Sequence, residues 1–417
     1  MDDFPPFEPL IYRRRLIQER LLSALSRMPV AFLAGPRQAG KTTLVRRIGA
    51  DPARRYLTLD DALTLEAAHS DPEGFIARLV PPVTIDEVQR VPQLFLAIKA
   101  RVDRERINGQ FLLTGSANVT LTARVADSLA GRMSTMTLWP LSQAEIEGCP
   151  GTFIDRIFEK DPALTTSGVQ LTERIIRGGY PQAHVVEPPV TGLHDFIGDL
   201  VTSLLQRDIR DIASVDDIFE LQRILRVLSA RPASELNVTR LASDLGIPRA
   251  TLMRYLRVLD LAFLTFSLPA WSGNATVRIS RSPKAYLADT AIACYEAGVD
   301  RQRLENDPLA LGHLTENFVA SEIMKLASWS RSRVSLFHYR THRDREVDLV
   351  LEKPNGSAVG IEVKASHKVT HDDLRGLNDL REQLGKRFVR GIVLYVGPDT
   401  QYLEDHIVLP ISALWRN

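Results

Sequence analysis

The segment GPRQAGKT, residues 35–42, constrains the fold of this chain more than any other feature. It matches the pattern G-x-x-x-x-G-K-[ST], which a chain of this length should contain by chance only about 0.02 times. An apolar run, residues 30–34, precedes it, and a helix-like segment, residues 43–48, follows it. The glycines let backbone N–H groups turn toward an anion beside the positive end of that helix. The sequence therefore predicts a phosphate-binding loop; the alternative is a glycine-bounded turn that only caps the helix.

The residues at the end of this loop favour a nucleoside triphosphate with a metal ion as the ligand. Lys41 can reach the β and γ phosphates, and the Thr42 hydroxyl can hold Mg²⁺. We therefore expect ATP and Mg²⁺ as cofactors. The residues expected to bind the nucleotide are Gly35, Pro36, Arg37, Gln38, Ala39, Gly40, Lys41, Thr42 and Thr43.

Two later apolar runs end in polar residues that suit the same site. The run 83–85 ends in Asp86, expected to hold the metal, and Glu87, expected to accept a proton from the attacking water. The alternative for this pair is a solvated turn. The run 111–113 leads to Ser116 and Asn118, which could reach the γ phosphate or the water; N-capping of the next helix is the alternative.

Between residues 30 and 138, short apolar runs alternate with amphipathic segments, as in βα units that build a mostly parallel sheet. The other runs lie at 56–59 and 133–138. Residues 141–211 are mostly helical and interrupted by glycine and proline, which suggests a lid or connector. A chain of 417 residues is long enough for two to four domains at the usual ~100 to 200 residues each.

The composition indicates in which compartment the protein works and which classes of partner it can bind. A net charge of +1 gives no chain-wide basic surface for nucleic acid or membrane, and any basic face must be local. The two cysteines, Cys149 and Cys294, are too few for a disulfide framework or a zinc site, as in proteins of a reducing compartment. No apolar run approaches the ~18 residues of a membrane helix. We therefore expect a cytoplasmic protein without membrane contact.

Residues 217–270 show three helical patterns in succession and close on a strand-like run at 263–266. Asn237 is expected to cap one helix, Gly246 to end it, and Pro248 to open the next. This order predicts a winged-helix-like region whose last helix could enter the major groove of DNA. Basic and acidic residues are nearly balanced there, which favours the alternative, an interdomain packing module. The arginines on the outer face are Arg249, Arg254 and Arg257.

Near the C-terminus, two alternating runs, residues 346–352 and 358–364, flank the segment KPNGS. They predict a hairpin with a three-residue loop, Pro354 to Gly356, because a two-residue loop would pair apolar with charged residues. This register sets Asp348 opposite Glu362, and Glu346 opposite Lys364.

Carboxylates that face each other across a hairpin repel unless a cation or a proton lies between them. A second divalent ion, Mg²⁺ or Mn²⁺, held by Asp348, Glu362 and Glu316 would resolve the repulsion. With Lys364 to orient a water, this set suits metal-assisted hydrolysis of DNA or RNA. The alternative is a solvated face on which Glu346 and Lys364 pair as ions.

These motifs together resemble the AAA+ ATPases, specifically the bacterial and archaeal AAA family with a C-terminal domain of the DUF4143 type. The resemblance also rests on LTGS at residues 113–116, SLAGR at 128–132, LWPLS at 138–142 and RGGYP at 177–181. It implies that Ser116 is sensor 1, that Arg132 is an arginine finger for a neighbouring subunit, and that Arg177 is a sensor 2 contact. It further implies a homo-oligomer, commonly a hexameric ring. For Arg132 the alternative is an ordinary salt bridge.

The C-terminal order helix, three strands, helix, strand is similar to the PD-(D/E)XK nuclease superfamily, many members of which cleave nothing. The expected architecture is therefore α/β, with a P-loop ATPase core (1–140), a helical lid (141–211), a winged-helix-like domain (212–284) and a nuclease-like domain (285–417). We expect ATP hydrolysis coupled to a nucleic-acid-binding or nuclease-like domain. The alternative is an ATP-controlled switch of oligomerisation or DNA binding, in which the nuclease fold is silent.

Overall fold

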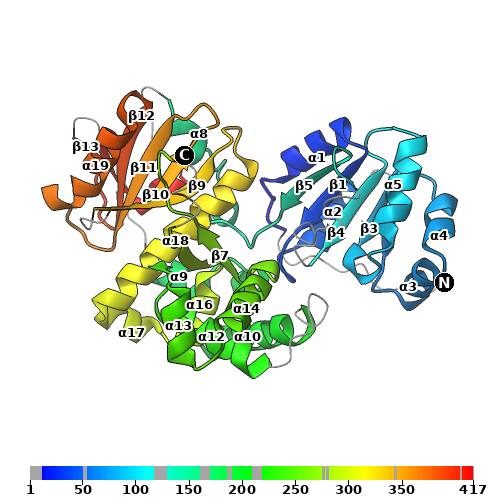
Figure 1. Cartoon of the computed structure of the whole chain (residues 1–417), viewed down its shortest axis with the longest axis horizontal. Coiled ribbons are helices and arrows are strands. Elements are labelled where there is room, and N and C mark those ends of the chain that lie inside the picture. Colours follow the sequence, from blue (N-terminus) through cyan, green and yellow to red (C-terminus); the bar gives the residue numbers. More distant parts are fainter. Residues whose placement is uncertain are drawn as a thin grey trace.

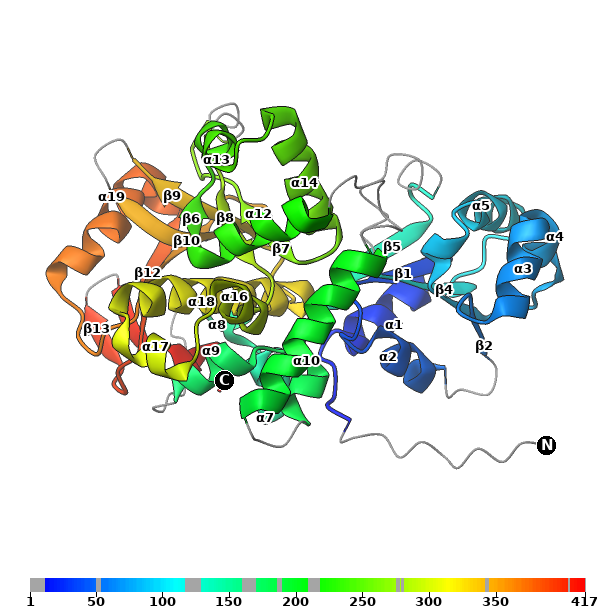
Figure 2. The same cartoon turned by 90° about the horizontal axis from the view of Figure 1, so that it is seen from below.

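The structure is a computed structural model that describes residues 12–49, 54–116, 129–159, 170–185, 190–208, 218–274, 278, 281–341, 345–403 and 406–416. Asn118 lies outside these residues. A five-stranded sheet and a six-stranded sheet occupy opposite ends of the long axis, with a helical part between and beside them (Figures 1 and 2). Within the described ranges, no helix combines the length and the apolar character needed to cross a membrane.

The N-terminal sheet is parallel throughout, as the sequence predicts, with the strand order β2-β3-β4-β1-β5. Because the strands are parallel, their carboxyl ends meet at one edge. Helices cover both faces: Ala31 and Leu33 pack toward α1 and α2, whereas Val30 and Phe32 pack toward α4 and α5. The elements are α1 (Gln18–Arg27), β1 (Val30–Ala34), α2 (Lys41–Ile48), β2 (Arg55–Thr58), α3 (Ala62–Ser70), α4 (Pro72–Arg78), β3 (Val83–Asp86), η1 (Val88–Arg90), α5 (Leu94–Arg104), β4 (Phe111–Gly115) and β5 (Met133–Thr137).

The helical middle part contains the caps that the sequence predicts. The Asn237 side chain accepts a hydrogen bond from the Arg240 N–H, Gly246 ends α13 at φ 69°, and Pro248 precedes α14. The strand β7 begins two residues later than predicted, because α14 extends to Leu261. The elements are α7 (Gln143–Glu147), α8 (Phe153–Arg156), α9 (Leu171–Arg177), η3 (Pro181–His184), α10 (Val190–Ser203), η4 (Leu204–Asp208), α12 (Ile218–Ala230), β6 (Ser234–Glu235), α13 (Val238–Leu245), α14 (Arg249–Leu261), β7 (Thr265–Leu268), β8 (Lys284–Leu287), α16 (Thr290–Ala297) and α17 (Arg301–Asn306).

The C-terminal sheet is mixed, with the strand order β13-β14-β12-β11-β10-β9. The predicted sequence of helix, three strands, helix and strand is present, and β13 and β14 extend the sheet beyond it. Short strands of this kind carry too few residues for a clear alternating pattern. The elements are α18 (Pro308–Trp329), β9 (Ser335–Arg340), β10 (Glu346–Glu352), β11 (Ala358–Lys364), η5 (His371–Leu374), α19 (Arg375–Leu384), η6 (Gly385–Arg387), β12 (Phe388–Tyr395), β13 (Gln401–Leu403), β14 (His406–Pro410) and η7 (Ile411–Leu414).

The hairpin of β10 and β11 has the predicted register and loop. Glu352 pairs with Ala358 and Leu349 with Ile361. The Lys353 N–H donates to the Ser357 carbonyl at 2.8 Å, and Gly356 has φ 83°, which a three-residue loop requires. The ladder stops one residue before the expected Asp348–Glu362 pair.

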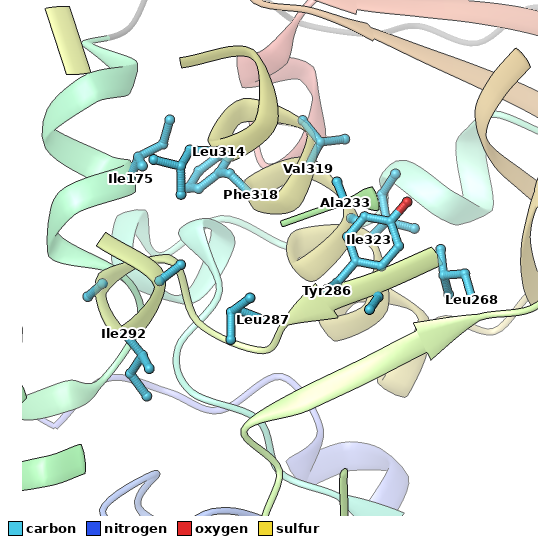
Figure 3. Close-up of a cluster of buried hydrophobic side chains, with 14 of the residues drawn as sticks. Ile175, Ala233, Leu268, Tyr286, Leu287, Ile292, Leu314, Phe318, Val319 and Ile323 are labelled. Atoms are coloured by element: carbon cyan, nitrogen blue, oxygen red, sulfur yellow. The ribbon is translucent and has the colours of Figure 1, made fainter. Parts of the chain in front are cut away.

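One hydrophobic core joins the helical middle part to the C-terminal sheet. It includes Ile175 of α9, Tyr286 of β8, Ile292 of α16 and Phe318 of α18, all buried (Figure 3). It continues through α18 to Ile361 of β11. The N-terminal sheet instead forms separate clusters on its two faces.

Candidate active site

The loop of residues 35–40 lies where β1 ends and α2 begins, at the carboxyl edge of the parallel sheet. Gly35 has φ 154°, and a Cβ there would lie 2.2 Å from the Leu138 carbonyl oxygen. Gly40, with φ 95°, directly precedes the first helical residue, Lys41. Glycine is therefore required at both ends for conformation and, at Gly35, for space.

The Lys41 ammonium lies inside this loop. Its Nζ donates to the carbonyl oxygens of Gly35 and Pro36, both at 2.9 Å, and the residue is only 4% exposed. An anion bound at the loop would interact favourably with this buried ammonium, because charge attraction is stronger where water is excluded.

Asp86, at the end of β3, forms the centre of a hydrogen-bond network. Its Oδ2 accepts from the Thr42 hydroxyl at 2.8 Å and from the Tyr56 hydroxyl at 2.7 Å, and its Oδ1 accepts from the Thr114 hydroxyl. A hydroxyl and a carboxylate side by side, next to the phosphate loop, fit Mg²⁺, which takes one or two protein ligands and completes its shell with phosphates and water. No group of three or more His, Cys, Asp or Glu residues suited to a metal is found in the part of the chain that the structure describes. A magnesium–nucleotide site needs no such group.

Glu87 follows Asp86 in a left-handed conformation, φ 59°, which is uncommon for a residue with a side chain. Its N–H donates to the Thr114 hydroxyl at 3.0 Å. The Gln89 amide donates both to the Glu87 carboxylate and, at 2.9 Å, to the Ser116 hydroxyl. The backbone turn at Glu87 therefore brings the expected base and Ser116 to the same amide group.

Three residues at this edge were not predicted as site residues. Tyr56 and Thr114 contact Asp86, and Gln89 joins Glu87 to Ser116. Gln89 could have been found from the motif TIDEVQ, because a 3-10 turn places it near Glu87. Nothing in the sequence indicates that Tyr56 belongs to the site, since it lies on β2, whose pairing with β3 is a tertiary contact.

Tyr56 is expected to hold the Asp86 carboxylate in position. Burial, together with the hydrogen bond to Asp86, raises the pKa of Tyr56 to about 12, so the phenol stays protonated and remains a donor at any ordinary assay pH. We expect Tyr56→Phe to weaken Mg²⁺-dependent ATP turnover about 2- to 10-fold, the effect of one lost hydrogen bond. Turnover measured across a Mg²⁺ titration checks this expectation. Tyr339→Phe is the matched control, because it also removes a tyrosine–aspartate contact, with Asp379 in the C-terminal part, and should leave the titration unchanged.

Neither Arg132 nor Arg177 lies at this chain's phosphate loop. Arg132 directly precedes β5, at the sheet edge opposite the loop, and its Nε lies 2.5 Å from Asp103. Arg177 ends α9, where it pairs with Glu173 at 3.0 Å and donates to the Ala183 carbonyl. The sensor 2 contact of Arg177 stays a prediction, and a role for Arg132 would require a second subunit.

The motif RGGYP instead packs the end of α9 against the segment between β8 and α16, within the middle part. Gly178 has φ 63°, and a Cβ there would lie 2.1 Å from the Asp289 carboxylate. The Gly179 N–H donates to the same carboxylate at 2.7 Å. The two glycines thus permit the close packing of two distant segments.

The C-terminal residues separate into two ion-pair groups. Glu316, Glu346 and Asp348 surround the ammonium of Lys284, a residue of β8 that was not predicted as a site residue. The ion pair of Glu346 with Lys364, which belonged to the alternative of a solvated face, is not among the contacts of the described residues. Lys364 pairs with Glu362 at 3.0 Å and with Asp373 at 3.2 Å, because the hairpin ladder ends at Leu349 and η5 brings Asp373 nearby.

Burial and charge shift the pKa values in both groups. Burial, and then the Asp348 carboxylate, raise the pKa of Glu316 to about 8. Burial opposes the charged form of Lys284, but the carboxylates of Asp348 and Glu316 outweigh it and raise its pKa well above the usual value. Burial and Asp348 also raise the pKa of Glu362.

Three families match separate parts of the sequence. They are described as AAA domain (residues 27–147), Domain of unknown function (DUF8612) (residues 169–303) and Domain of unknown function (DUF4143) (residues 311–414). Among solved structures, the fold is similar to the Walker-type ATPase PABY2304 of Pyrococcus abyssi, at 15% identity and a TM-score of 0.45 over 69% of this chain and 96% of that one. It is also similar to the Thermotoga maritima RuvB Holliday junction branch migration motor, at 17% identity and a TM-score of 0.30 over 61% and 89%.

Two relatives cover almost the whole sequence. The uncharacterized proteins Rv2008c of Mycobacterium tuberculosis and Mb2031c of Mycobacterium bovis are each 30% identical to this chain over 403 residues, which are 96% of this chain and 83% of the relative. The chain therefore belongs to the family of these two mycobacterial proteins, with an AAA domain in its N-terminal part and a DUF4143 domain at its C-terminal end.

Proposed function

We propose that the chain binds ATP with Mg²⁺ and hydrolyses it at the carboxyl edge of the parallel sheet. The observation that carries this proposal is the 2.8 Å hydrogen bond between the Thr42 hydroxyl and the Asp86 carboxylate. Thr42 lies in the first turn of α2, next to the glycine loop that encloses the buried Lys41. The match to the AAA domain supports it. The nucleotide would supply the phosphoanhydride bond that is broken.

Each residue of the site has a separate role in this proposal. The N–H groups of the loop and Lys41 bind the phosphates, and Thr42 and Asp86 hold Mg²⁺. Glu87 accepts the proton of the attacking water, since it is the carboxylate next to Asp86 that is not engaged with Thr42. Ser116, fixed through Gln89, orients the same water or the γ phosphate.

Metal removal tests this proposal directly. Purified chain should release phosphate from ATP with Mg²⁺, and excess EDTA should abolish the release because two protein ligands of the site act only through the ion. Phosphate release and fluorescent-nucleotide binding are the measurements. Protein that binds no nucleotide, with or without Mg²⁺, would contradict the proposal.

A second candidate, a nucleotide-controlled switch, is favoured by one buried arginine. Arg15 donates to the carbonyl oxygens of Ala39, in the loop, and Trp139, and it pairs with Glu145 of α7 at 3.0 Å. Glu145 in turn caps α7, the first helix of the middle part. A shift of the loop on ATP binding would therefore reach the middle part through Arg15.

In this switch, ATP would control assembly into a homo-oligomer, with Arg132 offered to the neighbouring subunit, or the binding of DNA by the winged-helix-like part. The exposed outer face of α14, with Arg249, Arg254 and Arg257, is the surface proposed for DNA. Light scattering with and without ATP separates the two candidates: a slow ATPase whose assembly size changes with nucleotide supports the switch, and rapid turnover at constant size supports an enzyme.

A further inference from the structure

The C-terminal acidic cluster carries its own cation. We propose that Lys284 replaces a divalent metal ion between Glu316, Glu346 and Asp348, so that the chain takes up no catalytic metal there. The nuclease-type ligand set expected from the hairpin would then be a structural ion cluster. This proposal is independent of ATP hydrolysis.

The distances place the ammonium at the centre of the cluster. The Nζ of Lys284 lies 2.5 Å from Glu346, 2.8 Å from Glu316 and 3.2 Å from Asp348. An ammonium has three N–H donors, one for each carboxylate. The lysine side chain is only 3% exposed, so the centre of the cluster is filled by protein.

The protein also uses part of the remaining acceptor capacity of these carboxylates. The Glu316 oxygen that accepts from Lys284 also accepts from the Tyr286 hydroxyl at 3.1 Å, and the second oxygen of Asp348 accepts from the Val363 N–H at 2.9 Å. A metal ion would have to displace Lys284 and would lose these contacts. The residues therefore do not fit a divalent ion in this arrangement.

Glu362, the remaining expected ligand, belongs to the neighbouring ion-pair group. Its Oε1 pairs with Lys364, whereas its buried Oε2 has no hydrogen-bond partner among the described residues. Glu362 is thus the carboxylate to which a metal ion could bind without displacing a donor from Oε2, and the experiment below therefore includes a Glu362 variant.

The location of Lys284 explains what the cluster does instead. Lys284 begins β8, the central strand of the three-stranded sheet, while its partners belong to α18 and β10. Nearby, an isolated bridge joins Ala270, two residues after β7, to His338 of β9. Lys284 therefore joins the middle part to α18 and β10 through ion pairs, and its ammonium occupies the position between the carboxylates that a metal ion would need.

Metal binding by the full chain without nucleotide tests the proposal. Mn²⁺ titration followed by electron paramagnetic resonance, together with melting temperature, is measured for wild type, Asp348→Asn, Glu362→Gln, Lys284→Met and Lys284→Met/Asp348→Asn. Wild type should show no Mn²⁺ binding that depends on Asp348 or Glu362. Lys284→Met should melt roughly 5 to 10 °C lower, because it leaves buried carboxylates without a cation. Mn²⁺ should restore part of that loss, and Asp348→Asn should restore part of it without metal.

Wild-type uptake of one Mn²⁺ per chain that disappears in Asp348→Asn or Glu362→Gln would overturn the proposal, since Lys284 would then yield to a metal. This comparison remains decisive if Lys284→Met does not fold. A Lys284→Met chain that folds, as judged by a cooperative melting transition, yet neither melts lower nor gains a Mn²⁺ site would overturn it too.

Discussion

Replacing Glu87 by glutamine is expected to lower ATP turnover about 10²- to 10⁴-fold and to leave ATP binding intact. Glutamine has nearly the same shape and can still accept a hydrogen bond from Gln89, so the loop, Lys41 and the Thr42–Asp86 contact are preserved. What is lost is the proton acceptor for the attacking water. Single-turnover phosphate release and fluorescent-nucleotide binding, measured on the same preparation, separate chemistry from binding.

Glu66→Gln is the matched control for this variant. Glu66 lies on α3, where its carboxylate accepts a hydrogen bond only from the exposed Ser70 hydroxyl among the contacts described, and it should retain full turnover. If Glu87→Gln hydrolysed ATP at the wild-type rate, Glu87 could not be the base, and the proton would have to leave through another group at this edge.

Replacing Lys41 by alanine is expected to weaken ATP binding by about 10²- to 10³-fold, and turnover should fall at least as far. Removing one member of a desolvated ion pair costs on the order of 2 to 5 kcal/mol, and Lys41 is a buried cation that we expect to contact the phosphates. The carbonyl oxygens of Gly35 and Pro36, which now accept from its ammonium, would then repel the incoming anion. Equilibrium binding of a fluorescent ATP analogue gives the loss directly.

Two further variants show whether charge or shape is responsible. Lys41→Arg keeps the positive charge, but its planar guanidinium group is larger than the ammonium that the loop holds. We therefore expect this variant to bind ATP poorly as well. Lys386→Ala, at an exposed lysine of η6, removes a charge far from the loop and should bind ATP as wild type does. Tight ATP binding by Lys41→Ala would refute the assignment of this loop as the phosphate site.

The N-terminal site could be predicted in part because its strongest signals are local. The loop, the strand before it and the helix after it occupy about twenty consecutive residues, and the acidic pair ends one short strand. The edge of a parallel sheet then brings the strand ends together whatever the loop lengths are. The residues that complete the network around Asp86 could not be predicted, because Tyr56 and Thr114 meet it only through strand pairing.

The sequence by itself determined the features whose partners lie within a few residues: the glycine conformations of the loop, the caps of α13 and α14, and the three-residue turn at Gly356. Alternation with period two also determined the hairpin register, since any slip would bury charge. Only the tertiary structure decided what faces the hairpin carboxylates. Lys284 lies 64 positions from Asp348 on a four-residue strand, and long-range packing alone turns a possible metal site into a lysine-centred ion cluster.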